Sequence, residues 1–173
     1  MKNYKEQLKN ITTFIFDYDG VMTSGDVLVD ANGVQLRSSD VKDGYALHYA
    51  VKSGYIVSVI SGGTGDNMRV RMKSLGVENV MLGVSYKLDK FEDFLIENDL
   101  QAEEVLYMGD DIPDYEVVKA AGIGACPADA CYEIKSIADY ISPFKGGNGA
   151  VRDVIEQVMN IQDKWISDSA FHW

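Results

Sequence analysis

Short apolar runs alternate with amphipathic segments along most of the chain. The predicted strands are 12–16, 55–60, 80–82, 105–108, 123–126 and 140–141, and the predicted helices are 41–52, 64–75, 88–98, 113–121, 132–137 and 150–165. Thr64 is the predicted N-cap of the second of these helices. Strands that alternate with helices of this length indicate βαβ units. The pattern therefore predicts an α/β, Rossmann-like three-layer fold in which helices cover both faces of a parallel sheet.

The segment between the first strand and the first long helix has a different pattern. Within residues 25–38, two short β-prone runs flank Asn32 and Gly33, and an Asn-Gly turn between such runs is a strong hairpin signal. We therefore expect a β-hairpin inserted after the first strand.

Two carboxylates directly follow the first strand. The run 12–16 is apolar and β-prone, as expected for a strand buried on both faces, and it is followed by Asp17, Asp19 and Gly20. Carboxylates at the end of a buried strand are costly without a compensating cation, and oxygen-only ligands favour Mg²⁺. Gly20 permits a tight turn beside such a site. An exposed turn made of ordinary Asp and Gly residues is the alternative interpretation.

Further polar side chains stand at the ends of later strands. Ser61 follows the second long strand, Asp110 and Asp111 follow the fourth, and Lys87 precedes the helix 88–98. Right-handed crossovers bring the carboxyl ends of parallel strands to one edge, where such sheets bind ligands. Singly, a loop serine, an aspartate N-cap and a surface lysine are ordinary features. Together, at successive strand ends, they predict one acidic crevice.

Composition limits the classes of function. The chain has 173 residues, 46% of them hydrophobic and 25% charged, so we expect one globular domain spanning 1–173. Its net charge of −11 argues against nucleic acid or an anionic membrane as a partner. No run approaches the roughly 20 apolar residues of a membrane span, and the polar N-terminus lacks a signal-peptide core, so we expect a cytoplasmic location. Cys126 and Cys131 are expected to be free thiols.

Four motifs resemble those of the haloacid dehalogenase superfamily, in the same order. They are DYDGV at 17–21, Ser61, Lys87 and GDDIPD at 109–114. Within that superfamily, SSDVKDGYALHYAV, GVSYKLDKFEDF, YMGDDIPD and GGNGAVRD resemble segments of the 3-deoxy-D-manno-octulosonate 8-phosphate phosphatases. The resemblance implies a small fold without a cap domain. It also implies Mg²⁺-dependent hydrolysis of that sugar-acid phosphate, a step in lipopolysaccharide sugar biosynthesis.

The resemblance assigns a role to each motif residue. Asp17 is the expected nucleophile, which forms an aspartyl-phosphate, and Asp19 is the expected acid and base. Ser61 and Lys87 are expected to bind the phosphoryl group. The expected magnesium ligands are the Asp17 carboxylate, the Asp19 backbone carbonyl and Asp110, supported by Asp111 and Asp114.

Substrate contacts carry over less completely. Three arginines of the family are replaced, by His48, Gly63 and Asn148, whereas Arg71 and Arg152 are retained. A relative type that acts on 2-keto-3-deoxynononate 9-phosphate has Glu at the position of Gly63, which favours the octulosonate phosphate here. The resemblance places at the substrate Asp19, Gly20, Asp40, Val41, Lys42, Asp43, Gly44, His48, Gly62, Gly63, Arg71 and Lys87.

Two other classes of function stay open. One is a catalytically silent binding protein on a phosphatase fold, although the nucleophile, the acid/base, the lysine and the metal aspartate are all present. The other is a phosphoacceptor receiver domain. It shares an acidic pocket, but its elements follow a different order and it has no need of DxDG or GDDxxD.

The hairpin also bears on assembly. Val27 and Val29 are on one face of the ribbon and Leu28 is on the other, so both faces need cover. The resembled family forms tetramers whose hairpins pack into a central barrel and whose active sites an adjacent subunit completes. We therefore expect a homotetramer, with the aromatic tail 171–173 as a candidate for closing the site. The alternative is a monomer whose hairpin folds onto its own sheet.

Overall fold

A six-stranded parallel sheet lies at the centre of the computed structural model, which describes residues 4–171 and, except at 168 and 169, their side chains. The strand order is β5-β4-β1-β6-β7-β8, and every pairing is parallel. The strands are β1 (Thr13–Phe16), β4 (Ile56–Ile60), β5 (Asn79–Met81), β6 (Val105–Met108), β7 (Ile123–Cys126) and β8 (Tyr140–Ile141). The predicted α/β fold is confirmed, because each strand lies within one residue of its predicted bounds.

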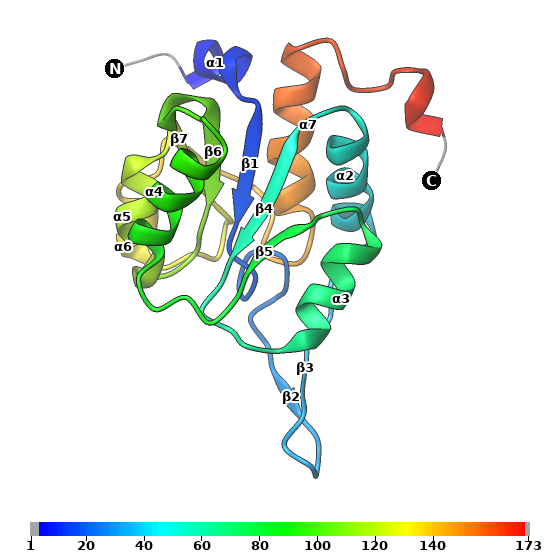
Figure 1. Cartoon of the computed structure of the whole chain (residues 1–173), viewed down its shortest axis with the longest axis vertical. Helices are drawn as coiled ribbons and strands as arrows, with labels where there is room; N and C mark the ends of the chain where they lie inside the picture. Colours follow the sequence, from blue (N-terminus) through cyan, green and yellow to red (C-terminus); the bar gives the residue numbers. More distant parts are fainter. Residues whose placement is uncertain (1–3, 172–173) are drawn as a thin grey trace.

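Helices cover both faces of this sheet (Figure 1). One face carries α2 (Val41–Lys52), α3 (Asp66–Ser74) and α7 (Ala150–Ile161), and the other carries α4 (Lys87–Glu97), α5 (Tyr115–Ala120) and α6 (Tyr132–Lys135). The side chains of β1 alternate between the two cores, with Phe14 and Phe16 in the first and Ile15 in the second. The sequence of β1 is therefore largely apolar, because both of its faces are buried, and does not alternate between apolar and polar residues.

Several short helices escape the sequence pattern. They are α1 (Tyr4–Gln7) and the 3-10 helices η1 (Leu8–Asn10), η2 (Ala102–Glu104) and η4 (Asp168–Phe171). The predicted helix 113–121 consists of a 3-10 helix, η3 (Ile112–Asp114), followed by α5. Within residues 4–171, no helix has both the length and the apolar character needed to cross a bilayer.

Two helix ends differ from prediction for local reasons. The last helix stops at Ile161, before 165, because Asp163 adopts a φ of 55°. The N–H groups of Asp163 and Lys164 then bond back to carbonyls of the last turn, a helix-ending arrangement that usually uses glycine. Thr64 was the wrong N-cap, since Gly65 occupies that position without a side-chain cap.

The predicted hairpin is present and stands away from the sheet, beyond its carboxyl edge (Figure 1). Its strands are β2 (Leu28–Val29) and β3 (Gln35–Leu36). Asp30 fixes the turn, because its carboxylate accepts the backbone N–H groups of Asn32 and Val34, both at 2.8 Å. Gly33 supplies the required positive φ of 80°.

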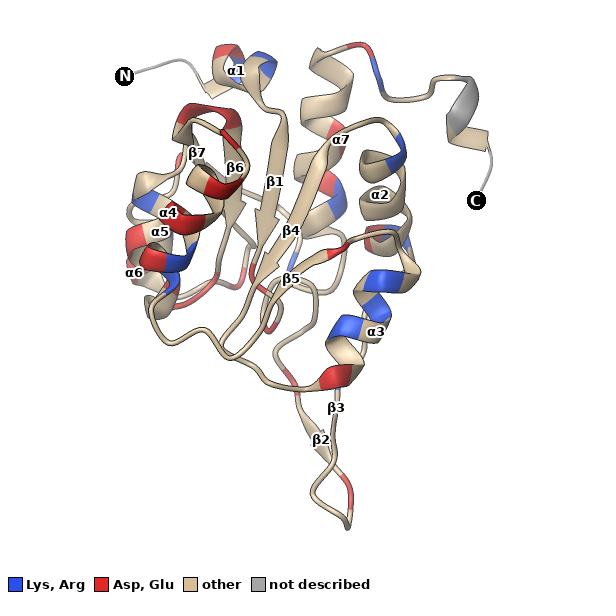
Figure 2. Ribbon diagram, in the orientation of Figure 1, with Lys and Arg blue, Asp and Glu red and all other residues tan. Residues whose placement is uncertain are grey.

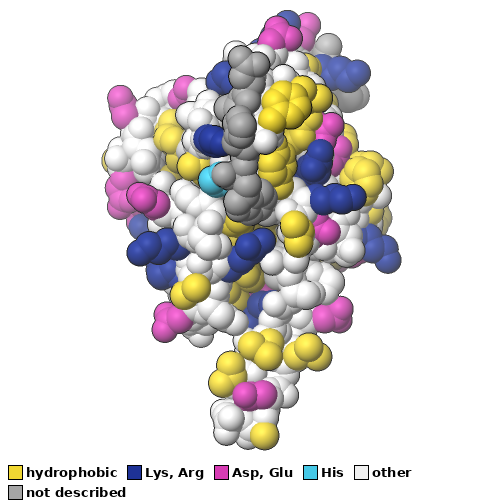
Figure 3. All heavy atoms as spheres, turned by 90° about the vertical axis from the view of Figure 1, so that its right-hand side faces the viewer, with side chains coloured by type: hydrophobic (Ala, Val, Ile, Leu, Met, Phe, Trp, Pro, Cys, Tyr) yellow, Lys and Arg dark blue, Asp and Glu magenta, His cyan; other side chains and the backbone are white. Residues whose placement is uncertain are grey.

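The hairpin leaves its apolar side chains in solvent. Leu28 is 71% exposed and Val29 is 62% exposed. Figure 3 shows apolar side chains gathered on this projecting arm. The structure therefore contradicts the alternative in which the hairpin folds down onto its own sheet.

Candidate active site

A cavity of about 440 Å³ lies at the carboxyl ends of β1, β4 and β6. Acidic residues lie on the loops at this edge (Figure 2). Every residue expected in nucleophilic attack, acid/base work, phosphate binding or metal binding lines the cavity. These residues are Asp17, Asp19, Ser61, Lys87, Asp110, Asp111 and Asp114, together with Gly20, Gly62 and Gly63. The convergence that the strand order predicted is present.

Asp17 is held at the end of β1 with one oxygen paired and the other not. Its Oδ2 atom lies 3.1 Å from Nζ of Lys87. Its Oδ1 atom is buried and has no hydrogen-bond partner among the described residues. Burial and the negative charge of Asp114 raise the pKa of Asp17 to about 7, although Lys87 acts against this rise. The site is therefore short of positive charge at this carboxylate.

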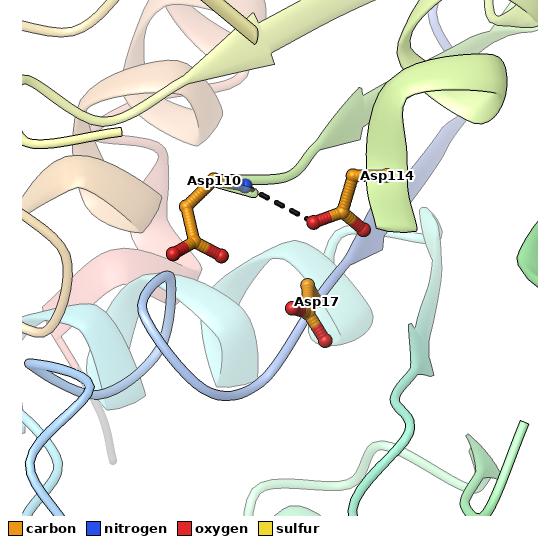
Figure 4. Close-up of side chains that lie close together, drawn as sticks. All are labelled: Asp17, Asp110 and Asp114. Carbon is orange, nitrogen blue, oxygen red and sulfur yellow. Dashed lines mark hydrogen bonds between the residues drawn. The ribbon is translucent and has the colours of Figure 1, made fainter. Parts of the chain in front are cut away.

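Asp114 connects the site to the core beneath it. Its Oδ1 atom accepts hydrogen bonds from Lys87 Nζ at 2.7 Å and from the Tyr107 hydroxyl at 2.5 Å. Its Oδ2 atom accepts the backbone N–H groups of Asp110 and Asp111, at 3.2 and 3.4 Å. Figure 4 shows the first of these two backbone contacts. Both oxygens are thus engaged by the protein itself.

Tyr107 contacts the site from within the core, and sequence reasoning did not single it out. It lies in the middle of β6, where its ring is one apolar residue among several, and it is fully buried. Burial and the charge of Asp114 raise the pKa of Tyr107 well above 10. The hydroxyl therefore stays protonated and donates a hydrogen bond to Asp114. A buried tyrosine needs such a partner, which is the one signal that the sequence offered.

The acidic cluster fits a divalent cation. Carboxylate oxygens of Asp17, Asp110 and Asp114 lie within 4.8 Å of one another (Figure 4). Burial, followed by the charges of Asp114 and Asp111, raises the pKa of Asp110 to about 7. Because the oxygens of Asp114 are already engaged, Asp17 and Asp110 are the carboxylates best placed to bind a cation. An all-oxygen donor set of this kind suits Mg²⁺.

Glycines bring the backbone close around these carboxylates. Gly20 has a φ of 82°, and a Cβ atom there would lie 2.0 Å from Oδ2 of Asp110. Behind this turn, a Cβ atom on Gly146 would lie 1.9 Å from the carbonyl oxygen of Gly20. Gly147 donates its N–H to the carbonyl of Val21 at 2.9 Å. The loop before α7 therefore backs the turn that carries the first two aspartates.

Ser61 and Lys87 approach the cavity from the sides of β4 and α4. Ser61 is buried, and its Oγ atom accepts the backbone N–H of Gly63 at 3.1 Å. Burial acts to lower the pKa of Lys87, but the carboxylates of Asp17 and Asp114 outweigh it and the pKa is raised. Lys87 therefore stays charged, as a phosphate-binding lysine must.

Asp19 is paired with an arginine that sequence reasoning did not single out. Arg37 lies just after β3, where the hairpin returns to the body. Its Nε atom lies 2.5 Å from Oδ1 of Asp19, and its Nη2 atom lies 3.0 Å from Oδ2. The pair is a two-pronged, charge-assisted contact across the base of the hairpin.

The predicted substrate residues on α2 lie outside the cavity of their own chain. Asp40 caps α2 by accepting backbone N–H groups, and Val41 is 71% exposed. The carboxylate of Asp43 accepts the N–H groups of Gly149 and Arg152 and so ties α2 to the start of α7. The other predicted substrate residues of α2 also lie outside the cavity. Lys42 lies beside Asp40, and Gly44 lies against the guanidinium of Arg71. His48 contacts the carbonyl of Leu75.

The aromatic tail adds little within the described residues. Phe171 is 73% exposed, and His172 and Trp173 lie outside the part of the chain that the structure describes. Its role in closing the site stays a prediction.

Comparisons with known proteins identify similar chains. A family model for haloacid dehalogenase-like hydrolases matches residues 77–155. The chain is 35% identical, over 156 residues, to the 3-deoxy-D-manno-octulosonate 8-phosphate phosphatase KdsC of Escherichia coli (strain K12). That match covers 90% of this chain and 83% of the relative.

Solved structures give the same picture. The 3-deoxy-D-manno-octulosonate 8-phosphate phosphatase of Moraxella catarrhalis, in complex with magnesium ion, phosphate ion and KDO, superposes with a TM-score of 0.91 at 30% identity, covering 96% of this chain and 94% of that one. The cobalt-bound deoxy-D-mannose-octulosonate 8-phosphate phosphatase of Haemophilus influenzae has a TM-score of 0.90 at 31% identity, with coverages of 95% and 98%. Both the sequence and the fold are therefore similar over nearly the whole chain.

Proposed function

Since the chain belongs to the family of 3-deoxy-D-manno-octulosonate 8-phosphate phosphatases, we propose that it hydrolyses this sugar-acid phosphate to 3-deoxy-D-manno-octulosonate and phosphate. The observation that carries the proposal is the pairing of Asp17 with Lys87 in one cavity with Asp19, Ser61 and Asp110. Family membership excludes the receiver-domain interpretation. The gathering of all these groups favours an enzyme over a silent binding protein.

The first half of the reaction uses Asp17 and Asp19. A carboxylate oxygen of Asp17 attacks phosphorus, and the bond from phosphorus to the sugar oxygen breaks. Asp19 gives a proton to that leaving oxygen. Ser61 and Lys87 hold the phosphoryl oxygens while the aspartyl-phosphate forms.

The second half regenerates the site. Asp19 takes a proton from a water that attacks phosphorus, the bond to Asp17 breaks, and phosphate leaves. Throughout both halves Asp114 holds Lys87 in place through its 2.7 Å contact, and Tyr107 in turn holds Asp114. These two residues position the reacting groups without touching the substrate.

Magnesium is the cofactor that the donor set suits. The Asp17 carboxylate, the Asp19 carbonyl and Asp110 would hold the ion, with Asp111 and Asp114 fixing the surrounding backbone. When bound, the ion offsets the negative charge of the aspartates and of the phosphoryl group. The unpaired Oδ1 atom of Asp17 and the raised pKa of Asp110 support this assignment.

A homotetramer is the proposed assembly. The hairpin leaves apolar surface on both faces, and the cavity of a single chain offers few contacts to a sugar. Hairpins packed around a symmetry axis would cover these faces and close their edges. The residues of α2 that lie outside the cavity of their own chain, and Arg71, are candidates for contact with substrate held by a neighbour. The cytoplasmic location stays a prediction.

Phosphate release from a panel of sugar phosphates tests the function. We expect Mg²⁺-dependent release that is most efficient with 3-deoxy-D-manno-octulosonate 8-phosphate and weaker with 2-keto-3-deoxynononate 9-phosphate. More efficient release from 2-keto-3-deoxynononate 9-phosphate would identify that compound as the substrate instead. No release from any phosphate ester, with magnesium bound, would indicate a silent binding protein.

A further inference from the structure

Arg37 contacts both carboxylate oxygens of Asp19, the residue that must exchange a proton with the substrate in the proposed reaction. Its two contacts, Nε to Oδ1 at 2.5 Å and Nη2 to Oδ2 at 3.0 Å, take up the whole carboxylate of Asp19. The Arg37 side chain is only 7% exposed, whereas that of Asp19 is 33% exposed and faces the cavity. A leaving sugar oxygen must reach this carboxylate, so at least one of the two contacts has to open during turnover.

The cavity has a surplus of negative charge that a sugar acid would meet. Five aspartates line it, and Lys87 is the one cation among its lining residues in the described chain. Lys87 is already shared between Asp17 and Asp114. A substrate that carries a carboxylate as well as a phosphate therefore needs a second cation, placed beyond Asp19 along the sugar.

Arg37 stands where that cation is needed. It lines a second hollow at the base of the hairpin, formed by residues 33–37 and 64–67, which we call the hairpin-base groove. The groove adjoins the active-site cavity, because Gly62 and Gly63 line the cavity and the next two residues line the groove. Asn67 spans the groove by donating to the carbonyl of Gln35 at 3.1 Å. A sugar whose phosphate lies near Asp17 can extend past Arg37 into this groove.

We propose that Arg37 is a specificity residue that exchanges partners. In the empty site it holds Asp19, and in the complex it pairs with the carboxylate of the sugar acid, which releases Asp19 to the leaving oxygen. The exchange replaces one guanidinium–carboxylate pair with another, so little pairing energy is lost. A sugar phosphate without a carboxylate must open the Asp19–Arg37 pair with no replacement partner, so it should be turned over more slowly. The inference rests on the proposed function, since it assumes a sugar-acid substrate.

The test compares two substrates and three variants. The substrates are 3-deoxy-D-manno-octulosonate 8-phosphate and arabinose 5-phosphate, which has the phosphate ester but no carboxylate. For Arg37→Ala we expect the KM for the sugar-acid phosphate to rise about tenfold or more, while the KM for arabinose 5-phosphate changes less than about twofold. Arg37→Lys keeps the charge and should recover part of the loss. Arg69→Ala removes an exposed arginine from α3 and should alter neither KM.

A binding measurement separates affinity from turnover. Free 3-deoxy-D-manno-octulosonate carries the carboxylate but no phosphate, and its dissociation constant should rise about tenfold in Arg37→Ala relative to wild type. The inference would be overturned if Arg37→Ala lost the same fraction of kcat/KM on both substrates and bound the free sugar acid as tightly as the wild type. Arg37 would then be a fixed support for Asp19. A wild-type enzyme that cleaves arabinose 5-phosphate but not the sugar-acid phosphate would overturn the proposed substrate, and the inference with it.

Discussion

The ammonium group of Lys87 lies 3.1 Å from the carboxylate of Asp17, and yet burial still raises the pKa of Asp17 to about 7. One lysine does not balance this carboxylate, because Asp114 adds a second negative charge at 2.7 Å from the same ammonium group. The site is therefore short of positive charge until a cation binds beside these carboxylates.

Asp17→Asn should abolish turnover and preserve the fold. The amide keeps the shape of the carboxylate but cannot attack phosphorus, and the buried position loses a costly charge. Phosphate release and circular dichroism would measure the two effects, with Asp89→Asn on the exposed face of α4 as the matched control. Appreciable phosphate release by a well-folded Asp17→Asn protein would rule out the covalent mechanism.

Asp19→Ala should slow the reaction most where the leaving group is poor. Loss of a proton donor costs on the order of 10²–10⁴-fold with an alkyl phosphate such as the sugar-acid phosphate. An aryl phosphate, whose leaving oxygen needs less protonation, should lose much less and serves as the internal control. The same fractional loss of kcat on both substrates would contradict the assigned role.

Magnesium should stabilise the protein more as pH rises. The pKa values of Asp17 and Asp110 are raised from 3.8 to about 7, so without metal their contribution to folding is greatest below the unfolded pKa and is lost as pH rises toward 7. A bound cation favours the ionised carboxylates and reverses this loss. The rise in Tm on replacing EDTA with MgCl₂ should therefore be larger at about pH 7.5 than at about pH 5. An Asp110→Asn variant should lose most of this pH dependence, and equal rises in Tm at both pH values in the wild type would refute the charge imbalance.

Tyr107→Phe should weaken both the fold and the reaction. It removes the hydroxyl that donates to Asp114 at 2.5 Å and leaves that oxygen with Lys87 alone. We expect a loss of about 1 kcal/mol in the free energy of unfolding. We also expect a loss of about tenfold in kcat, as for other residues that orient metal-site groups. Tyr86→Phe, at an exposed tyrosine, should change neither quantity. A normal kcat in Tyr107→Phe would show that Lys87 is held in place without the hydrogen bond from Tyr107 to Asp114.

Leu28→Lys should dissociate the proposed homotetramer. A charge placed on the apolar ribbon opposes burial between subunits, so light scattering coupled to gel filtration should report a smaller species. Ile96→Lys, at a side chain that is 81% exposed on α4, makes the same change away from the hairpin and should leave the size unaltered. The dissociated variant should also lose its preference for the sugar-acid phosphate over an aryl phosphate. A fully active wild-type monomer would contradict the proposal that a neighbouring subunit completes the active site.

Local patterns were sufficient for the elements and for the motif residues. The run that ends in Asp17 is apolar on both faces and then turns polar at once, so its buried strand and its acidic end could be read from neighbouring residues alone. The contacts that were missed join distant parts of the chain. Arg37 meets Asp19 only because of the path that the hairpin takes, and Asp43 caps α7 across 106 positions. No periodicity encodes such pairings.

The glycine loop behind Gly20 has a consequence for synthesis. The turn that carries Asp17 and Asp19 emerges from the ribosome early, whereas Gly146 and Gly147, whose backbone packs directly against that turn, emerge near the end. A nascent chain that stops before this loop has the motif but lacks the backbone that presses against it. Catalytic competence should therefore appear late in translation. Fragments truncated before residue 146, which lack both this loop and the core helix α7, should stay inert even though they contain every proposed catalytic residue.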